Sequence, residues 1–479
     1  MYTKALRTTW LNTYGCVKSQ LATFLRFQYP LEYNQPRIRK QFPGPKHQEA
    51  LENIQAYNLD AQYQVQRFID FKKSKGNYFA DVDGNIVLDL HQNYANLALG
   101  YNHDVFVNAR HTELYDRFVA NRVDASVLPT EDYADLLRDN VMPIAPAGMT
   151  QVHLNDGTTT QANESALTIA LLKYAQEHGK TAQDAQNLCV LGFQNGYHGN
   201  SIATLSCSDA EVNLQQVPTF DWPVAPFPQM KYPMSQYEHE NIAEEDRCLQ
   251  EARRIIKERR DQKKDVGAMI VEPISAYNNE MATPRFYKEL RKIATEFHIP
   301  FIVDETKTGV GSTGKMWGHE HWYLSQPADI VTFGGKSGIS GFYSTVDFRL
   351  SDQEGALSFE QNVDMVKLLN FGLTWRYIQK KNLLSYVNDT STFLKIELAR
   401  VNNEKGICEN IRGYGTFLGF DVPQGHSETV QKYLFRSGIH LLRCGPRTFG
   451  LRPALILGPK QAAYLRDNLM YYSPNIPKN

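Results

Sequence analysis

The stretch DIVTFGGKSGISGFYST, residues 329–345, decides how this chain is expected to fold. Its first five residues predict a buried strand, because a short apolar run bounded by turn residues is typical of the interior of a sheet. Two glycines follow, and then a single lysine, Lys336, stands among small residues. This arrangement raises the question of why an amine should follow directly on a buried strand.

Similar apolar runs recur upstream of Lys336 and alternate with helical patterns. The runs cover residues 188–193, 266–273 and 300–305, and the amphipathic helices cover residues 163–178 and 284–298. Continuous apolar strands that alternate with helices predict an α/β fold with a mostly parallel sheet covered on both faces.

The two ends of the chain predict a second, smaller unit. Residues 76–90 alternate apolar and polar positions around Asp83-Gly84, which predicts a hairpin. From about Asn382 the pattern gives a helix, strands within 413–422 and 450–458, and a final helix, as in a smaller α+β domain. We therefore expect an arm at 1–31, the first part of the small domain at 32–110, a large domain at 111–381 and the rest of the small domain at 382–479.

Composition excludes several classes of function. The 479 residues carry a formal net charge of −1, which does not suggest nucleic acid or an anionic membrane as a partner. No apolar run approaches the ~18 residues that a membrane span needs. The six cysteines are scattered without CxxC spacing, so we expect a reduced compartment and no metal site.

The first 31 residues differ from the rest of the chain. They contain no aspartate or glutamate, but they include lysine, arginine, serine and threonine. This composition is typical of a mitochondrial transit peptide and predicts a mitochondrial matrix protein. The alternative is a basic arm that packs on the folded protein.

Polar side chains follow three of the predicted strands. These are Glu272, Asp304 and Lys336, and in an open parallel sheet ligands bind beyond the carboxyl ends of the strands. An acid beside one strand end and a lysine beside another suggest a carbonyl cofactor held as a Schiff base. A lysine is a useful nucleophile when its pKa is lowered, and an aspartate paired with a pyridine nitrogen keeps the ring electron-poor.

Three further residues complete this hypothesis. Gly157 and Thr158 lead into a helix, whose free N–H groups and dipole suit a phosphate. Tyr197 could stack on a flat ring. Each residue also has a structural alternative when taken alone: a helix cap or ion pair for Asp304, a surface amine for Lys336, and a core aromatic for Tyr197.

Together these residues resemble the class III, pyridoxal-phosphate-dependent aminotransferases, and within them the 4-aminobutyrate (GABA) transaminase branch. The resemblance runs from about Pro43 to the C-terminus. It includes FDWPVAPFPQMKYP at 220–233, STGKMWGHEHW at 312–322 and GLRPALIL at 450–457. It implies a fold type I transferase, with a mostly parallel seven-stranded sheet and a smaller α+β domain, that forms homodimers with active sites at the interface.

The resemblance also assigns roles to the residues at the strand ends. It implies that Lys336 is the Schiff-base lysine and proton-transfer base, that Asp304 pairs with the pyridine nitrogen, and that Tyr197 occupies the ring-stacking position. Glu272 and Arg452 match a glutamate–arginine pair in which the glutamate masks the arginine for amino donors and swings away for 2-oxoglutarate.

The remaining assignments lie in the cofactor and substrate contacts. Gly157 and Thr158 match the phosphate-binding turn, with a one-residue insertion nearby. Four positions depart from the family pattern. Asn200 stands where an arginine grips the substrate carboxylate, Thr306 replaces an apolar residue under the ring, Lys307 replaces a glutamine at the ring hydroxyl, and Ser358 lies nearest a threonine of the partner-subunit segment that closes the phosphate site.

Two functions remain open from the sequence. The retained Lys336, Asp304, Glu272 and Arg452 favour an aminotransferase that moves an ω-amino group from GABA or a similar amine to a 2-oxo acid, most simply 2-oxoglutarate. The altered contacts favour a catalytically lapsed homologue kept as a subunit of a larger mitochondrial complex, such as a respiratory-chain assembly. A cofactor-binding sensor without turnover is a third, weaker alternative.

Overall fold

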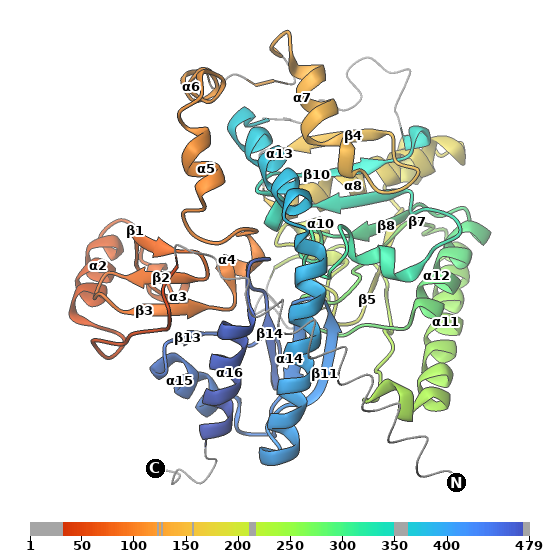
Figure 1. Cartoon of the computed structure of the whole chain (residues 1–479). Coiled ribbons are helices and arrows are strands. Elements are labelled where there is room, and N and C mark those ends of the chain that lie inside the picture. Colours follow the sequence, from red (N-terminus) through yellow and green to blue (C-terminus); the bar gives the residue numbers. More distant parts are fainter. Residues whose placement is uncertain are drawn as a thin grey trace, which may run out of the picture.

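A seven-stranded sheet forms the centre of this computed structural model, which describes residues 32–121, 124–125, 128–155, 158–209, 217–348 and 363–472 (Figure 1). The order of its strands is β4-β10-β9-β8-β7-β5-β6. In chain order they are β4 (Gln151–Asn155), β5 (Cys189–Phe193), β6 (Val224–Ala225), β7 (Val266–Val271), β8 (Phe301–Asp304), β9 (Ile330–Phe333) and β10 (Ser340–Ser344). Only β10 is antiparallel to its neighbours β4 and β9, so the predicted mostly parallel seven-stranded sheet is confirmed.

Alternate residues of the central strands belong to two different cores. Ala268 and Ile270 pack with one face of α8 (Thr159–Glu177). Met269 and Val271 belong instead to the larger core, which includes residues of α11 (Glu238–Asp261), α12 (Pro284–Glu296) and α13 (Met365–Lys380). Successive side chains of a strand point to opposite faces, so β7 reads as a continuous apolar run because both of its faces are covered.

Two smaller sheets carry the remaining strands. One has the order β1-β2-β3-β13 and the other β11-β12-β14. Their bounds are β1 (Ile69–Lys75), β2 (Tyr78–Asp81), β3 (Ile86–Asp89), β11 (Glu409–Tyr414), β12 (Phe417–Asp421), β13 (Ile439–His440) and β14 (Thr448–Leu451). The antiparallel pair β2–β3 is the predicted hairpin, and the parallel pair β3–β13 places an early segment beside a late one.

The other helices surround these sheets (Figure 1). The α-helices are α2 (Pro45–Gln55), α3 (Ala61–Gln64), α5 (Asp104–Ala109), α6 (Glu113–Ala120), α7 (Tyr133–Asn140), α9 (Ala182–Ala185), α10 (Ile202–Ser206), α14 (Leu383–Lys405), α15 (Ser427–Arg436) and α16 (Pro459–Tyr471). Short 3-10 turns are η1 (Met142–Ile144), η2 (Met234–Gln236), η3 (Gly318–Trp322), η4 (Gly335–Ser337) and η5 (Val346–Phe348). A further short segment, α4 (Gln92–Ala95), has left-handed backbone angles and is described with the site.

One predicted strand is wrong over most of its length. Residues 450–458 were expected to form a strand, but β14 ends at Leu451. Beyond it, the N–H of Arg452 donates to the carbonyl of Leu90 and the N–H of Leu455 to the carbonyl of Ala98. Pro453 has no N–H to continue a ladder, so the apolar run packs as a turn instead.

In the described ranges, no helix has the length and apolar character needed to cross a membrane. The predicted targeting segment at 1–31 lies outside the described residues.

Candidate active site

Three neighbouring strands of the central sheet end in polar side chains. Asp304 is the last residue of β8, Glu272 follows β7 directly, and Lys336 follows β9 by three residues. Because β9, β8 and β7 are adjacent and parallel, their carboxyl ends meet at one edge of the sheet. The structure thus brings together the three residues that the sequence singled out.

Lys336 is buried in the turn η4. Among the described residues, its Nζ donates one long hydrogen bond, of 3.5 Å, to the carbonyl of Ala95. Burial lowers the pKa of Lys336 to about 7, and the charges of Arg452 and Lys307 lower it in the same direction. Only the carboxylate of Asp89 opposes this effect. Near neutral pH a large fraction of this amine is therefore unprotonated, which is the form that reacts as a nucleophile or base.

The glycines before Lys336 are required by close packing. A Cβ at Gly334 would lie 2.5 Å from Cγ2 of Thr159, at the start of α8. Gly335 has a φ of +57°, and a Cβ there would lie 2.7 Å from the carbonyl oxygen of Thr306. Both positions demand glycine, so the turn that carries Lys336 can pass between the ends of β8 and α8.

Asp304 is a buried carboxylate that accepts hydrogen bonds on both oxygens, including a long one of 3.4 Å from the Thr332 hydroxyl to Oδ1. Oδ2 accepts hydrogen bonds of 2.8 Å from Asn163 Nδ2 and His198 Nδ1. Oδ1 accepts from the backbone N–H of Thr306 at 2.9 Å and from its hydroxyl at 2.6 Å. Burial alone would raise the pKa of Asp304, but the hydrogen bond and charge of His198 and the donors of Thr306 hold it below its usual value. Asp304 is therefore ionised, and the same contact raises the pKa of His198 despite its burial.

No hydrogen bond or ion pair joins Glu272 to Arg452 in the described part of the chain, and the glutamate–arginine pair implied by the resemblance stays a prediction. Glu272 accepts hydrogen bonds from the backbone N–H groups of Tyr197 at 3.0 Å and Ala276 at 2.9 Å. Burial and the nearby charge of Asp304 raise its pKa to about 7, against the lowering effect of His198. Two backbone N–H groups thus hold the Glu272 carboxylate in this structure.

Arg452 lies buried against an aromatic ring. Its Cζ is 3.4 Å from the ring centroid of Phe417, and its Nη1 and Nη2 donate to the carbonyls of Leu451 and Ala276 at 2.9 and 3.4 Å. Burial lowers its pKa to about 10. Ala276 contacts both residues, because its N–H donates to Glu272 and its carbonyl accepts from Arg452. Arg452 and Glu272 therefore lie beside the same backbone segment.

A cavity of about 900 Å³ opens beside these residues. Its walls include Arg452, Lys307, Tyr197, Ala95 and Ala276. Lys336 and Glu272 do not line it, but each is hydrogen-bonded to a wall residue, Lys336 to Ala95 and Glu272 to Tyr197 and Ala276. The amine therefore lies directly behind the wall of the cavity.

Lys307 is a cation of this wall without a fixed anion. It has no hydrogen bond or ion pair with any residue in the described part of the chain, and burial lowers its pKa. Asp304 and Glu272 raise that pKa from a distance, but their oxygens are occupied by the donors named above. The cavity therefore carries positive charge from Lys307 and Arg452 and suits an anionic ligand.

The remaining predicted residues lie at the edge of the site or outside the described residues. The Tyr197 hydroxyl donates to Asn200 Oδ1 at 2.7 Å. Asn200 is exposed and is not a wall residue of the cavity, so it reaches the site through Tyr197. Thr158 precedes the first residue of α8 and makes no side-chain cap. Gly157 and Ser358 lie outside the described residues.

The carbonyl that contacts Lys336 belongs to an unusual turn. The four residues of α4 all have positive φ, from 47° at Gln92 to 67° at Ala95. Such angles cost about 1–2 kcal/mol per non-glycine residue, so surrounding contacts must hold the turn. Asp89 does so, because its Oδ1 accepts from the backbone N–H groups of His91 and Gln92 at 3.0 and 2.8 Å.

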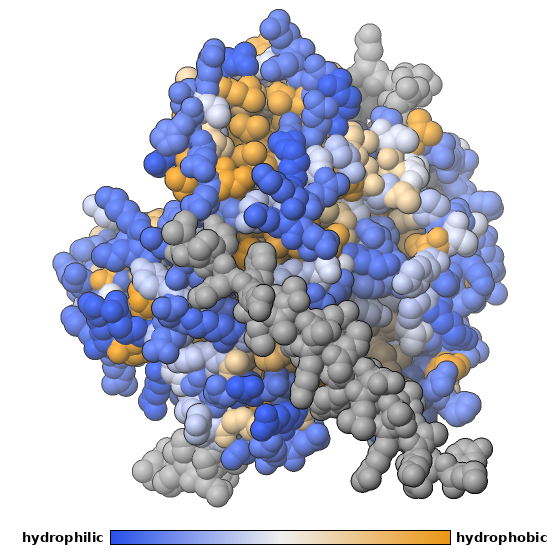
Figure 2. Space-filling model, viewed as in Figure 1, coloured by the Kyte–Doolittle hydropathy of each residue, from blue (hydrophilic) through white to orange (hydrophobic). Residues whose placement is uncertain are grey.

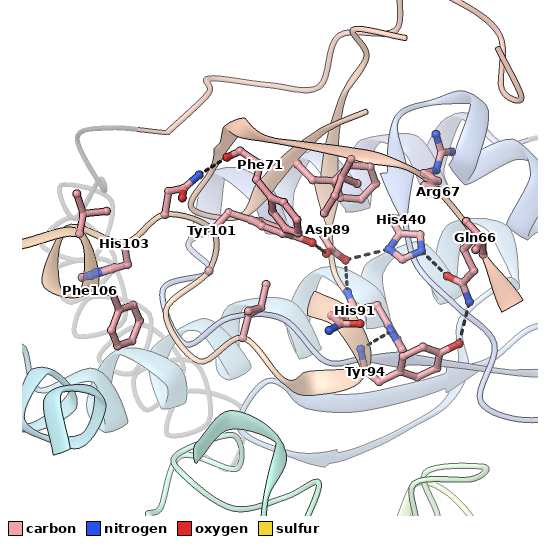
Figure 3. Close-up of a pocket in the computed structure, with 18 of the residues that line it drawn as sticks. Gln66, Arg67, Phe71, Asp89, His91, Tyr94, Tyr101, His103, Phe106 and His440 are labelled. Carbon is pink, nitrogen blue, oxygen red and sulfur yellow. Dashed lines mark hydrogen bonds and ion pairs between the residues drawn. The ribbon is translucent and has the colours of Figure 1, made fainter. Parts of the chain in front are cut away.

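Figure 3 shows the network around this turn and a second cavity, of about 730 Å³, on its other side. Asp89 also contacts His440 at 3.0 Å and the Tyr101 hydroxyl at 2.8 Å. Gln66 links His440 to the Tyr94 hydroxyl. Because Gln66 and Tyr94 line both cavities, this network forms the partition between them.

Sequence reasoning missed His198, Asn163 and the turn 92–95. His198 stands beside Tyr197, and a histidine next to a predicted site residue was the available signal. Asn163 lies one turn into α8 and gave no signal, because its contact with Asp304 depends on the packing of the helix against the sheet. The turn gave none either, since only Asn93 among its residues commonly adopts positive φ.

The residues fit pyridoxal phosphate as the bound group. Lys336 offers a largely neutral amine with one weak hydrogen bond, Asp304 offers an ionised carboxylate for a ring nitrogen, and the uncapped start of α8 offers free N–H groups to a phosphate. One contact must change, because both oxygens of Asp304 already accept hydrogen bonds from the protein. The Thr306 hydroxyl is the donor that can turn away.

Comparisons with known proteins agree with this chemistry. The family model for aminotransferase class III matches residues 60–470. The 4-aminobutyrate aminotransferase of Dictyostelium discoideum is 34% identical over 461 residues, covering 92% of both chains, and the human mitochondrial 4-aminobutyrate aminotransferase is 30% identical over 450 residues, covering 89% of this chain and 88% of its own.

Solved structures show the same fold at lower identity. A lysine aminotransferase from M. tuberculosis superposes with a TM-score of 0.76 at 22% identity, covering 85% of this chain and 94% of its own. An omega transaminase variant from Pseudomonas jessenii gives 0.74 at 16% identity, covering 88% and 96%. With the family model spanning most of the chain, this protein belongs to the class III aminotransferases, a pyridoxal-phosphate-dependent family.

Proposed function

We propose that this chain is an active aminotransferase that moves an ω-amino group, from 4-aminobutyrate or a similar amine, to 2-oxoglutarate. The observation that carries the proposal is Lys336, a fully buried amine with a pKa of about 7 whose one hydrogen bond in the described part of the chain is to the Ala95 carbonyl. A buried lysine without a salt bridge is costly, and a chain that no longer needed a reactive amine would gain stability by replacing it.

Each residue at the strand ends has a separate task in this proposal. Pyridoxal phosphate, when bound, supplies an electron-poor ring that takes up the electron pair left when the substrate carbon loses its proton. Lys336 takes that proton on Nζ and returns it, which its lowered pKa permits near neutral pH. Asp304, kept ionised by His198, stabilises positive charge on the ring nitrogen.

Anionic groups of the substrate are assigned to the two cations of the cavity. Arg452 would bind a carboxylate of the 2-oxo acid, and its stacking on Phe417 keeps the guanidinium in one orientation. Lys307, without an anion of its own, would ion-pair with the ring oxygen or with a substrate carboxylate. Asn200 would act by holding the Tyr197 ring, since it does not reach the cavity wall.

Assembly and location are also part of the proposal. We propose a homodimer in the mitochondrial matrix, with a segment around Ser358 closing the phosphate site of the partner, as the resemblance implies. Support for the location comes from the acid-free composition of residues 1–31 and from the mammalian relatives, whose names include the word mitochondrial.

The test is the visible absorbance of the purified protein with added pyridoxal phosphate. The wild type is expected to gain a band that bleaches when 4-aminobutyrate is added. Lys336→Ala should give no band, while Lys288→Ala, at an exposed position on α12, should behave like the wild type. Return of the band on addition of 2-oxoglutarate would identify the acceptor.

Two other results would contradict the proposal. A Lys336-dependent band that no amine changes would indicate a cofactor-binding sensor. Absence of a band in the wild type would indicate that the fold serves assembly, as in the lapsed-subunit alternative.

A further inference from the structure

A strongly basic surface pocket lies apart from the active-site cavity. It has a volume of about 430 Å³ and is formed mainly by residues 38–42 and by the C-terminal half of α15. Five of its lining residues are cationic: Arg39, Lys40, Arg67, Lys432 and Arg436. None of the described residues that line it is acidic. Because the whole chain has a formal net charge of −1, this is a local concentration of positive charge.

Most of this charge is not neutralised. Arg39, Lys40 and Arg436 form no ion pair within the described ranges, and all three are exposed. Lys432 pairs with Glu428 on the same helix at 2.5 Å, but that pair is exposed on both sides and contributes little. The positive potential of the pocket is therefore available to a ligand.

Arg67 forms the inner wall of the pocket and is held in an unusual state. Its side chain is 5% exposed and lies over the Phe42 ring, with Cζ 3.9 Å from the centroid. Its contact with Asp81 is long, at 3.5 Å, and its Nη2 is buried without a hydrogen-bond partner among the described residues. A buried guanidinium nitrogen without a hydrogen-bond partner is unfavourable, so the inner wall of the pocket holds a cation whose charge the fold satisfies only in part.

The outer rim of the pocket is also fixed in place. The side-chain oxygen of Asn85 accepts from the backbone N–H groups of Arg39 and Lys40 at 2.7 and 2.9 Å. Asn85 is itself buried and bonded to Asp81, which also contacts Arg67. The segment that carries two of the cations is thus tied to the same carboxylate as the cation of the inner wall.

We propose that this pocket binds a small molecule that carries a chain of phosphates, such as a nucleoside triphosphate or free polyphosphate. Five cations around one small volume exceed what a mono- or dicarboxylate would neutralise, whereas a triphosphate places three or four negative charges within a few ångströms. Arginine binds phosphate through two parallel hydrogen bonds, and three arginines line the pocket. This inference does not depend on the proposed aminotransferase activity.

The experiment is calorimetric titration of the full chain with tripolyphosphate and with ATP, at low and at physiological ionic strength. The wild type should bind at least one of them, more weakly at the higher ionic strength. The variant Lys40→Gln/Arg436→Gln should lose at least about tenfold in affinity, since two charge-assisted hydrogen bonds to phosphate are removed. The control Lys257→Gln/Lys288→Gln removes the same charge from exposed sites on α11 and α12 and should bind like the wild type.

The outcomes separate the sources of the phosphate chain. Equal affinity for the two ligands would mean that the phosphates alone are recognised, and tighter binding of ATP would mean that the apolar side chains of Ile38 and Phe435 contact the base. Lack of binding by both ligands would overturn the proposal. So would equal affinity in the two double variants, which would place the anion at another site such as the active-site cavity.

Discussion

The burial of Lys336 destabilises the folded protein. The pKa of Lys336 is about 7 in the folded protein and about 10.4 in an unfolded chain. Between these two pH values the amine is protonated in the unfolded chain but neutral in the folded protein. The free energy of unfolding should therefore rise as the pH increases from about 7 to about 10. Below pH 7 the amine is charged in both states, so the full cost of burying this charge is present. We predict that Lys336→Met stabilises the protein by a few kcal/mol at pH 6 and by much less at pH 10, measured by chemical denaturation without added cofactor.

Lys288→Met is the matched control for this prediction. The lysine is exposed on α12, so its removal should change stability little at either pH. If Lys336→Met destabilised the protein at pH 6, the amine would have a partner that the buried site does not provide.

Thr306 regulates how freely Asp304 can accept a ring nitrogen. Its hydroxyl occupies one position on Oδ1 at 2.6 Å, and the resemblance places an apolar residue there. We predict that Thr306→Val tightens pyridoxal phosphate binding by about threefold to tenfold, because valine keeps the shape and removes one competing donor that is worth about 1 kcal/mol. The measurement is the dissociation constant from the absorbance band, with Thr308→Val as control, since the Thr308 hydroxyl bonds Glu305 instead. Weaker binding in Thr306→Val would show that the hydroxyl supports the carboxylate rather than competing for it.

Some roles of single residues could be predicted from the sequence and others could not. Lys336 and Asp304 were predictable because each follows an apolar run, and the ends of neighbouring parallel strands must meet. The pairing of Glu272 with Arg452 stays a prediction, because Arg452 comes from a different sheet and the backbone N–H groups of Tyr197 and Ala276 donate to the glutamate in this structure. His198 and Asn163 needed the three-dimensional packing around Asp304.

At the scale of elements, the left-handed turn α4 controls the surroundings of the buried amine of Lys336. Asp89 anchors the turn, and its negative charge raises the pKa of Lys336. We predict that Asp89→Asn lowers the pH at which Lys336 becomes reactive and destabilises the protein by about 1–3 kcal/mol. The reactivity of Lys336 toward a neutral acylating reagent, followed by mass spectrometry across pH, measures the first effect.

Asp83→Asn separates the two effects of Asp89→Asn. Asp83 also accepts two backbone N–H groups, from Lys46 and His47, at 3.0 and 3.1 Å. It does not act on the pKa of Lys336, so its replacement should destabilise the protein and leave the reactivity profile in place. If the pH midpoint of Lys336 reactivity were the same in both variants, Asp89 would only hold the backbone of the turn and would not act on the pKa of Lys336.

The strands of the fold could be predicted from the sequence, with one exception. β7, β8 and β9 were predictable because continuous apolar runs need two covered faces. The run at 450–458 is equally apolar, but it packs as a turn against residues 90 and 98, and a pattern of hydrophobicity does not distinguish these two ways of burial. The turn at 92–95 has no pattern at all, because its angles are imposed by Asp89.

At the scale of the whole molecule, the active site joins two separately packed parts. Lys336, Asp304 and Glu272 come from the central sheet, whereas Arg452 follows β14 of a smaller sheet. The two parts have distinct cores, and the segment at 90–98 hydrogen-bonds to the chain after β14. The position of Arg452 relative to Lys336 therefore depends on how the two parts pack together, which explains why its role was the least predictable from sequence.

An exposed apolar patch indicates where a second copy would bind. Figure 2 shows an apolar patch in the upper part of the molecule, where Figure 1 draws α6 and α7. Val119 on α6 and Leu128 between α6 and α7 are exposed apolar residues of this part of the chain. A contiguous apolar surface of this kind is usual at protein interfaces, and burying a charge within one costs several kcal/mol. We predict that Val119→Glu/Leu128→Glu converts a dimeric wild type into a monomer, measured by light scattering after size exclusion.

A control variant and a measurement of cofactor binding test whether the cofactor site needs the dimer. Ile396→Glu introduces the same charge at an exposed apolar position on α14 and should leave the dimer intact. If the phosphate site needs a segment of the partner, the monomeric variant should also bind pyridoxal phosphate at least tenfold more weakly, while Ile396→Glu should not. A monomer that keeps wild-type affinity would mean that each chain forms its cofactor site alone, and a variant that stays dimeric would place the interface on another face.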